Sequence, residues 1–327
     1  MSFIRSKASS ILYTVKSIFQ PAYHFMSEEC PVISILFLVV LVVPVSIIIS
    51  THTVLAENVI RIIKPHSAMD QRHLYNNAIL SKALDKTIRG YGDYKIEFTH
   101  SGTQRDRALV ELISGRNINV HIVPTRNEWE EKTLPIRIPI VKGILGYRLF
   151  LIKRQNIKKF SYIKSLDELK VLRAGLRQQW STTKAMNALG FQVITGNNYE
   201  GLFHMLINNR FDYFPRGVNE IFSEFRSRSQ NMPDLRIEPG KALYLPMPTY
   251  VFVSPKYPEL AKRIETGLWK MVKDGSLDKI FWEYHKSNIQ QADLDQRQIF
   301  RVNNPFLSHE TPFEQKNLWL DPLTTPE

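Results

Sequence analysis

Segments rich in β-branched residues alternate with segments of helical hydrophobic spacing in the first half of this chain. Residues 59–64, 94–98 and 119–123 have the composition of short strands, whereas residues 75–88 and 103–114 repeat apolar side chains at helical intervals. Glycines follow both helical segments, as they do where helices end. An order of strand, helix, strand, helix and strand needs crossover connections, so it predicts a largely parallel sheet covered by helices.

A second alternation of the same kind starts near residue 165. Ser165 followed by Glu168 has the spacing of a capping box, which predicts a helix start. Strands are predicted at 173–177, 191–195 and 211–214, and helices from Ser181 or Thr182 to Leu189, at 199–209 and near 218–226. Two alternations of similar size predict an α/β protein with two lobes.

Two extended stretches, 134–152 and 243–253, interrupt these alternations, and each contains two prolines. We interpret both as strands that cross between the lobes. Two amphipathic helices are predicted after the second stretch, at 258–273 and 276–285. The remaining polar tail, 289–327, is expected to wrap the surface or to be partly disordered.

The uncharged apolar run at 32–49 is long enough to span a bilayer or to form the centre of a signal peptide. Short side chains before Ala56 favour a signal peptide cleaved after that residue, and an uncleaved membrane anchor is the alternative. In both cases the basic residues before the run favour a cytoplasmic N-terminus. We therefore expect a periplasmic protein, in contact with the membrane only through 32–49 if the segment is kept.

Charge and cysteine content exclude several classes of function. The 43 basic residues exceed the 31 acidic ones, but they are spread along the chain without a nucleic-acid-binding motif, so no nucleic-acid partner is expected. Cys30 is the only cysteine and lies in the leader, which excludes disulfides and thiolate sites from the rest. His66 and His121 lack partners at ligand spacing. No metal, cofactor or catalytic set is predicted.

Four segments resemble the extracellular solute-binding proteins of amino-acid ABC transporters, the family 3-like proteins. They are 134–139 (LPIRIP), 166–177 (LDELKVLRAGLR), 209–213 (NRFDY) and 275–282 (GSLDKIFW). The resemblance covers about 59–286 and implies the periplasmic binding protein type II fold, in which two α/β lobes joined by two crossing strands close over a solute. The lobes and flanking segments that it implies are 57–150 with 245–290 for lobe 1, 151–244 for lobe 2, 1–56 for the signal peptide or anchor and 291–327 for a C-terminal tail.

Two departures from the family pattern bear on the solute. The family usually carries an arginine that holds the ligand carboxylate in a Thr-x-Glu-Arg segment, where this chain offers Arg126 at a different spacing. The acid that takes the ligand ammonium usually lies four residues after the match to Asp212, where this chain has Arg216. We therefore expect a small anionic or amino-acid-like solute, with anions such as carboxylates or phosphate favoured.

The candidate ligand-binding residues share positions at strand ends and helix starts, where ligands of open α/β sheets gather. They are Arg216, Trp180, Ser181, Thr182, Arg126, Trp129, Ser67 and Ser101. A helix start such as Ser181–Thr182 suits an anion, and the two tryptophans could stack on a flat solute from opposite lobes. Each has a plainer alternative: a helix cap, an ion pair of Arg216 with Glu220 or Glu224 at the surface, or indoles in the core.

Three functions are compatible with these features. The first is capture of a small molecule for delivery to an inner-membrane permease or to a sensor, without catalysis. The second is an enzyme on the same fold, such as a dehydratase, with an acid or base among Glu128, Glu130 and Glu131, which are expected in an exposed loop. The third is a membrane-anchored interaction module that binds no small molecule.

Overall fold

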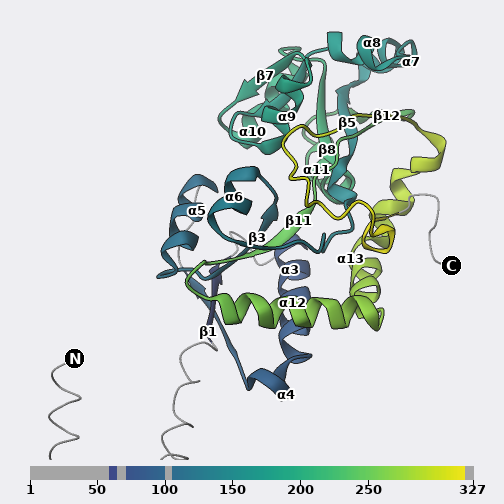
Figure 1. Cartoon of the computed structure of the whole chain (residues 1–327). Coiled ribbons are helices and arrows are strands. Elements are labelled where there is room, and N and C mark those ends of the chain that lie inside the picture. Colours follow the sequence, from purple (N-terminus) through teal and green to yellow (C-terminus); the bar gives the residue numbers. More distant parts are fainter. Residues whose placement is uncertain (1–58, 65–70, 100–104, 321–327) are drawn as a thin grey trace, which may run out of the picture. The chain divides into compact units, whose positions relative to one another are not determined.

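The computed structural model describes residues 59–64, 71–99 and 105–320 (Figure 1). All of them belong to one compact unit that begins at Glu57. The predicted leader, with the apolar run 32–49, lies outside the described residues, as do Ser67 and Ser101. None of the helices within the described ranges has the length and apolar character needed to cross a membrane.

Lobe 1 is built on five strands. They are β1 (Val59–Ile63), β2 (Lys95–Thr99), β3 (Val120–Pro124), β4 (Leu134–Ile136) and β11 (Thr249–Val253). β1 and β2 pair in parallel, as predicted. β3, however, forms its ladder with β11, which runs antiparallel between β3 and β4.

Asn119, directly before β3, joins that strand to β1 through its side chain and its backbone. The Asn119 Oδ1 accepts a hydrogen bond from the Arg61 N–H at 2.7 Å, and its Nδ2 donates to the Val59 carbonyl at 2.8 Å. The Asn119 N–H also donates to the Arg61 carbonyl at 3.0 Å. An amide side chain thus supplies the bonds that a regular parallel ladder would make, because it carries both a donor and an acceptor.

Helices cover both faces of this strand layer (Figure 1). The helices of lobe 1 are α3 (Gln71–Asp85), α4 (Ile88–Tyr91), α5 (Arg105–Ser114), α6 (Asn127–Lys132), α12 (Pro258–Lys273) and α13 (Ser276–Ala292). Along β11, Val251 and Val253 belong to the core cluster of α3 and α12, whereas Tyr250 and Phe252 belong to that of α5 and α6. This alternation is the period-two pattern of a strand buried on both faces.

Lobe 2 has a mixed, seven-stranded sheet in the order β12-β10-β5-β8-β6-β7, with β9 also paired to β5. Its strands are β5 (Tyr147–Lys153), β6 (Ala174–Arg177), β7 (Val193–Gly196), β8 (Tyr213–Gly217), β9 (Leu235–Ile237), β10 (Lys241–Tyr244) and β12 (Gln298–Arg301). Its helices are α7 (Ile157–Ser161), α8 (Leu166–Val171), α9 (Ser181–Ala188), α10 (Tyr199–Ile207) and α11 (Val218–Ser229). The second predicted alternation of strands and helices is confirmed, including the Ser165–Glu168 capping box.

Two segments link the lobes, and both lie within the stretches that the sequence marks as extended. Residues 137–146 lead from β4 to β5, and residues 245–248 lead from β10 to β11. We call them crossing segments 1 and 2. The part of the chain that the structure describes also contains four short 3₁₀ helices: η1 (Ile144–Gly146), η2 (Arg154–Asn156), η3 (Leu294–Gln296) and η4 (Lys316–Leu318). η1 lies inside crossing segment 1.

The C-terminal region is more regular than its polar composition suggests. The last helix continues past the predicted end to Ala292, because Ile289 and Ala292 extend the buried face that starts at Leu277 and Phe281. The tail then adds β12 to the sheet of lobe 2, in parallel with β10. Of the two alternatives for the tail, the described part, to residue 320, fits the one in which it wraps other elements, since β12 pairs with β10 and Val302 and Leu320 make backbone hydrogen bonds to Tyr244 and Lys142.

Candidate functional site

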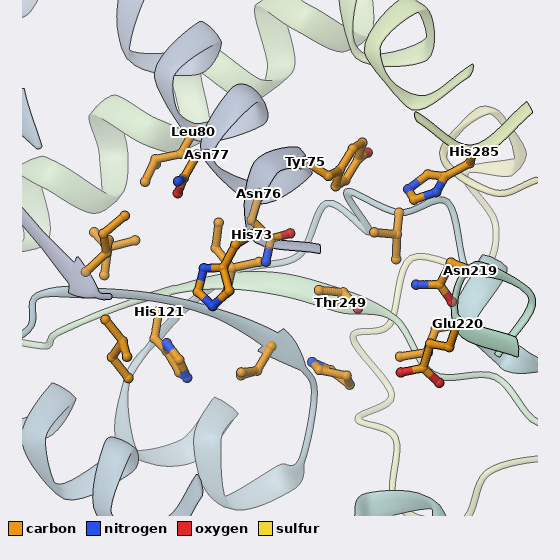
Figure 2. A pocket seen from close by; sticks show the side chains of 18 residues that line it. His73, Tyr75, Asn76, Asn77, Leu80, His121, Asn219, Glu220, Thr249 and His285 are labelled. Atoms are coloured by element: carbon orange, nitrogen blue, oxygen red, sulfur yellow. The ribbon is translucent and has the colours of Figure 1, made fainter. Parts of the chain in front are cut away.

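A cavity of about 320 Å³ lies where β1 and β3 end, between α3 and the crossing segments (Figure 2). Its apolar floor comes from these strands, including Ile62 and Val123. Val141 and Leu145 of crossing segment 1 and Thr249, the first residue of β11, form another part of the wall. Asn219 and Glu220, at the start of α11, bring lobe 2 to the cavity. The described lining therefore comes from both lobes and from crossing segment 1.

His285 of α13 is the most distinctive polar group of this lining (Figure 2). Its side chain is 8 % exposed, and neither ring nitrogen has a hydrogen-bond partner among the described residues. Burial next to the rings of Tyr75 and Phe281, at 4.7 and 5.2 Å between centroids, lowers the His285 pKa to about 4. The imidazole is therefore neutral near pH 7, with one nitrogen able to donate and the other able to accept.

Further polar groups surround the same space. Asn76 and Asn77 of α3 line it, and the buried Oδ1 of Asn219 has no hydrogen-bond partner among the described residues. Glu220 is the only acidic residue in the described lining, which contains no lysine or arginine. The cavity thus combines an apolar floor with a few polar groups, as small-molecule sites do.

Glu220 belongs to a buried cluster of two acidic and two basic side chains, which also contains Arg148, Arg216 and Glu224. Arg216 donates from Nε and Nη2 to the two carboxylate oxygens of Glu224, both at 2.6 Å, and its Nη2 lies 3.0 Å from Glu220. Arg148 lies 3.8 Å from Glu220 through Nη1. Burial lowers the pKa of Arg148 to about 10. Although burial also disfavours charge on Arg216, the two glutamates raise its pKa above the ordinary value.

Arg216 therefore lies at the end of a strand, as the sequence suggested, but its donors already serve two carboxylates. Its guanidinium also lies 4.6 Å from the ring centre of Trp180, which in turn stacks on Phe214. The ion pair given as the plainer alternative describes this arrangement, except that the pair is buried and not at the surface. Arg216 reaches the cavity only through Glu220.

Arg126 and Ser181 meet across the two lobes. Arg126 stands between β3 and α6 in lobe 1, and its Nε donates to the Ser181 Oγ of lobe 2 at 2.8 Å. Its Nη2 donates to the Gln179 carbonyl. Two of the candidate residues are thus brought together, in a contact that joins the lobes directly.

Of the other candidates within the described residues, Trp180, Thr182 and Trp129 do not line the cavity. Thr182 is buried, and its hydroxyl donates to the sulfur of Met247 in crossing segment 2 at 3.3 Å. Trp129 is fully buried against Phe252 and His121, so its ring belongs to the core of lobe 1 and does not face Trp180.

Sequence reasoning missed the groups that do line the cavity. The sequence does not mark His285 as a cavity residue. It lies four residues after Phe281 on the apolar face of its helix, where a core residue is expected. Asn219 and Glu220 lie in the first turn of the helix that follows the strand ending at Gly217. This position at a helix start is the feature of the sequence that could have identified them as cavity residues. Tyr75 is distant in sequence from His285, so only folding brings them together.

The glutamates considered for catalysis are placed differently from expectation. Glu128, Glu130 and Glu131 lie in helix α6, not in an exposed loop. Glu130 is buried, where its carboxylate accepts hydrogen bonds from Thr125 at 2.5 Å and from Arg137 at 2.9 Å. None of the three lines the cavity. Within the described residues no cluster of His, Cys, Asp or Glu could hold a metal ion.

No family model matches this sequence, and no curated protein is significantly similar to it. Solved structures do match. An ancestral arginine-binding protein bound to arginine aligns with a TM-score of 0.50 and 20% identity, over 69% of this chain and 98% of that one. An ancestral arginine-binding protein bound to glutamine aligns at 0.47 and 19%, over 69% and 97%. An ancestral amino-acid-binding protein, a precursor of cyclohexadienyl dehydratase, aligns at 0.48 and 16%, over 70% and 95%.

Together with the two lobes and two crossing segments, the first of these alignments defines the class of fold: this chain has the two-lobed fold of type II periplasmic binding proteins. Within that class, the first aligned structure is named an arginine-binding protein. The predicted fold is confirmed.

Proposed function

We propose that this protein captures a small solute between its lobes by hinge closure, and hands it to an ABC-type permease or to a sensor. The observation that carries the proposal is the cavity whose described wall is made by both lobes and by crossing segment 1. A solute in that position would contact both lobes and one of the links between them, so its binding energy would favour closure. Catalysis is not part of the proposal.

The lining favours an amino-acid-like or amine-bearing solute over a simple anion. The excess of basic residues does not extend to the described lining, where Glu220 is the only charged side chain. The Glu220 carboxylate and the unpartnered Asn219 oxygen both accept hydrogen bonds, and burial leaves His285 neutral. An apolar body with a donor group, such as an ammonium, fits these features. Arg216 would act on it indirectly, by orienting Glu220.

A thermal-shift screen of the full chain with amino acids, amines, carboxylates and phosphate tests the proposal. A solute at 100 times its dissociation constant adds about 2.7 kcal/mol to the stability of the folded state, so a true ligand gives a clear rise in Tm. Glu220→Gln should reduce that rise for amine-bearing solutes. Glu128→Gln, an exposed glutamate on α6, is the matched control and should not.

The screen also separates the alternatives. If anions alone raise the Tm, and Arg126→Ala abolishes the effect, the solute is anionic and the lining argument is wrong. If no compound raises the Tm, the solute-binding proposal fails. The interaction module is then favoured, an outcome that the direct Arg126–Ser181 contact between lobes would fit.

We further propose that the protein is exported, with cleavage after Ala56. Intact mass of the protein recovered from fractionated cells tests this: a chain that begins at Glu57 is expected, and a full-length chain in the membrane fraction would favour the anchor. The proposed lobe boundaries are 57–150 with 245–290 for lobe 1 and 151–244 for lobe 2, leaving 291–327 as the tail.

A further inference from the structure

The described part of the C-terminal tail, residues 293–320, makes its own connection between the lobes. We call it the strap. It leaves α13 of lobe 1 and enters the sheet of lobe 2 as β12 (Figure 1, where it is drawn in yellow). Arg297 donates to the Glu238 carbonyl at 2.6 Å, and Lys241 donates to the Gln298 side chain at 2.7 Å. The first half of the strap is therefore fixed to lobe 2.

After β12 the strap follows crossing segment 2. The Val302 N–H donates to the Tyr244 carbonyl at 3.0 Å, and the Asn304 Nδ2 donates to the Pro246 carbonyl at 2.9 Å. The Phe306 ring packs on the core of lobe 2, with the Lys184 ammonium 4.5 Å from its centre. Up to this point the strap contacts lobe 2 and the link that leaves it, apart from Arg297, whose Nε also donates to the Ala292 carbonyl at the end of α13 at 2.6 Å.

The strap then reaches crossing segment 1. The Glu310 carboxylate pairs with the Arg137 guanidinium at 2.6 Å, just beyond β4. Further on, Leu320 donates from its N–H to the Lys142 carbonyl at 2.8 Å, and the Lys142 Nζ donates to the Asn317 carbonyl at 2.7 Å. The same Lys142 Nζ binds Asp278 of α13 at 2.8 Å, so lobe 1 and the strap are held by one side chain. The strap thus contacts lobe 2 and both crossing segments, and it is joined to lobe 1 at α13 and through Lys142.

Its last contact falls where crossing segment 1 has an unusual backbone. Lys142 and Gly143 are consecutive residues in the left-handed region, with φ of 47° and 72°. The ring of Trp319 covers Gly143 so closely that a Cβ there would lie 2.6 Å from Trp319 Cε3. Hinges are the few residues that absorb changes in φ and ψ when domains move. The strap holds Lys142 through backbone and side-chain hydrogen bonds and covers Gly143 with the Trp319 ring, in the segment that links the lobes.

From these contacts we infer that the strap is a built-in clasp, which restricts rotation about the crossing segments and keeps the lobes close together before any solute binds. Opening by rotation would have to separate Glu310 from Arg137 or to detach residues 317–320 from Lys142. The inference concerns the lobes alone and holds whatever the solute is.

Pulsed electron spin resonance on the full chain, without solute, tests the clasp. Cys30→Ser removes the only native cysteine, so spin labels can be attached at Val110→Cys in lobe 1 and Val171→Cys in lobe 2. Both positions are well exposed, at 65 and 66 %. Glu310→Ala and Trp319→Ala should each shift the distribution of label distances to longer and broader values.

Glu314→Ala is the matched control, since Glu314 is an exposed glutamate of the same strap. It should leave the distribution unchanged. If Glu310→Ala and Trp319→Ala give the same distribution as the control, the clasp does not exist. Circular dichroism verifies that each variant is folded. If Trp319→Ala is unfolded, Glu310→Gln replaces it, because this variant removes the charge but keeps the size of the side chain, and the same shift to longer distances is expected. Because no solute is present, a failed solute screen leaves this result intact.

Discussion

Some charged side chains of this protein are buried, although charged groups normally stay in contact with water. Arg216 is only 3 % exposed, and it is tolerated because two glutamates balance it at hydrogen-bonding distance. Taking a charge out of water costs several kcal/mol unless a partner is present, so each member of such a cluster depends on the others. The sequence allowed the pairing to be foreseen, since Glu220 and Glu224 follow Arg216 at intervals of one helical turn. Its burial could not be foreseen, because that depends on residues from elsewhere in the chain.

Arg216→Ala should lower the free energy of unfolding by roughly 3–5 kcal/mol, because it leaves Glu224 buried without its partner. Arg216→Met combined with Glu224→Leu should recover most of this loss, since the pair is then replaced by apolar side chains of similar volume. Urea unfolding of both variants measures the difference. Equal losses in the single and double variants would contradict the buried pair.

His285 should make stability depend on pH. Its pKa is about 4 in the folded protein and about 6.5 in an unfolded chain, so the unfolded state binds a proton first as the pH falls. The stability that it contributes is complete above pH 6.5 and is lost as the pH falls towards 4, by up to about 3 kcal/mol. His285→Phe should flatten the stability profile in this window. Urea unfolding at several pH values checks it, and profiles of identical slope would show that His285 is not buried.

At the scale of elements, local sequence patterns predicted where helices and strands begin and end, but they did not predict which strands pair. The Ser165–Glu168 box and the start of α12 depend on neighbouring residues, which the sequence displays directly. The partner of β3 was wrong, because β11 belongs to the last third of the chain and no local pattern links the two. Asn119 replaces the ladder that a third parallel strand would have made with β1.

Asn119→Ala should therefore loosen the junction of β1 and β3. It removes the acceptor for the Arg61 N–H and the donor to the Val59 carbonyl, at a position with no exposure. Leaving buried groups unpaired costs about 1–3 kcal/mol each, so a loss of about 2–4 kcal/mol is expected. Asn117→Ala, at a nearby exposed side chain, serves as the control. Hydrogen exchange should accelerate in β1 only for Asn119→Ala, and equal exchange in both variants would contradict this role.

The whole molecule was predictable in outline, because two α/β alternations separated by proline-rich stretches specify two lobes and their links. The candidate site was less predictable. Of the proposed residues, Arg126 and Ser181 contact each other, and Arg216 reaches the cavity through Glu220. Trp129 lies in the core. The cavity instead takes its polar groups from α3, α11 and α13, which only the tertiary fold assembles. The clasp was likewise hidden in a tail of polar composition.

The order of the strands has a consequence for biosynthesis. β3 is synthesised early, but its pairing partner β11 is synthesised much later. β10 likewise pairs with β12 only when the chain is nearly complete. Pairings between residues distant in sequence form slowly, because closing the long loop between them loses entropy before the new contacts can compensate for it. The three-stranded sheet of lobe 1 and the seven-stranded sheet of lobe 2 therefore cannot be completed until the last third of the chain has been made. Until then each of them has an exposed strand edge that can pair with another chain.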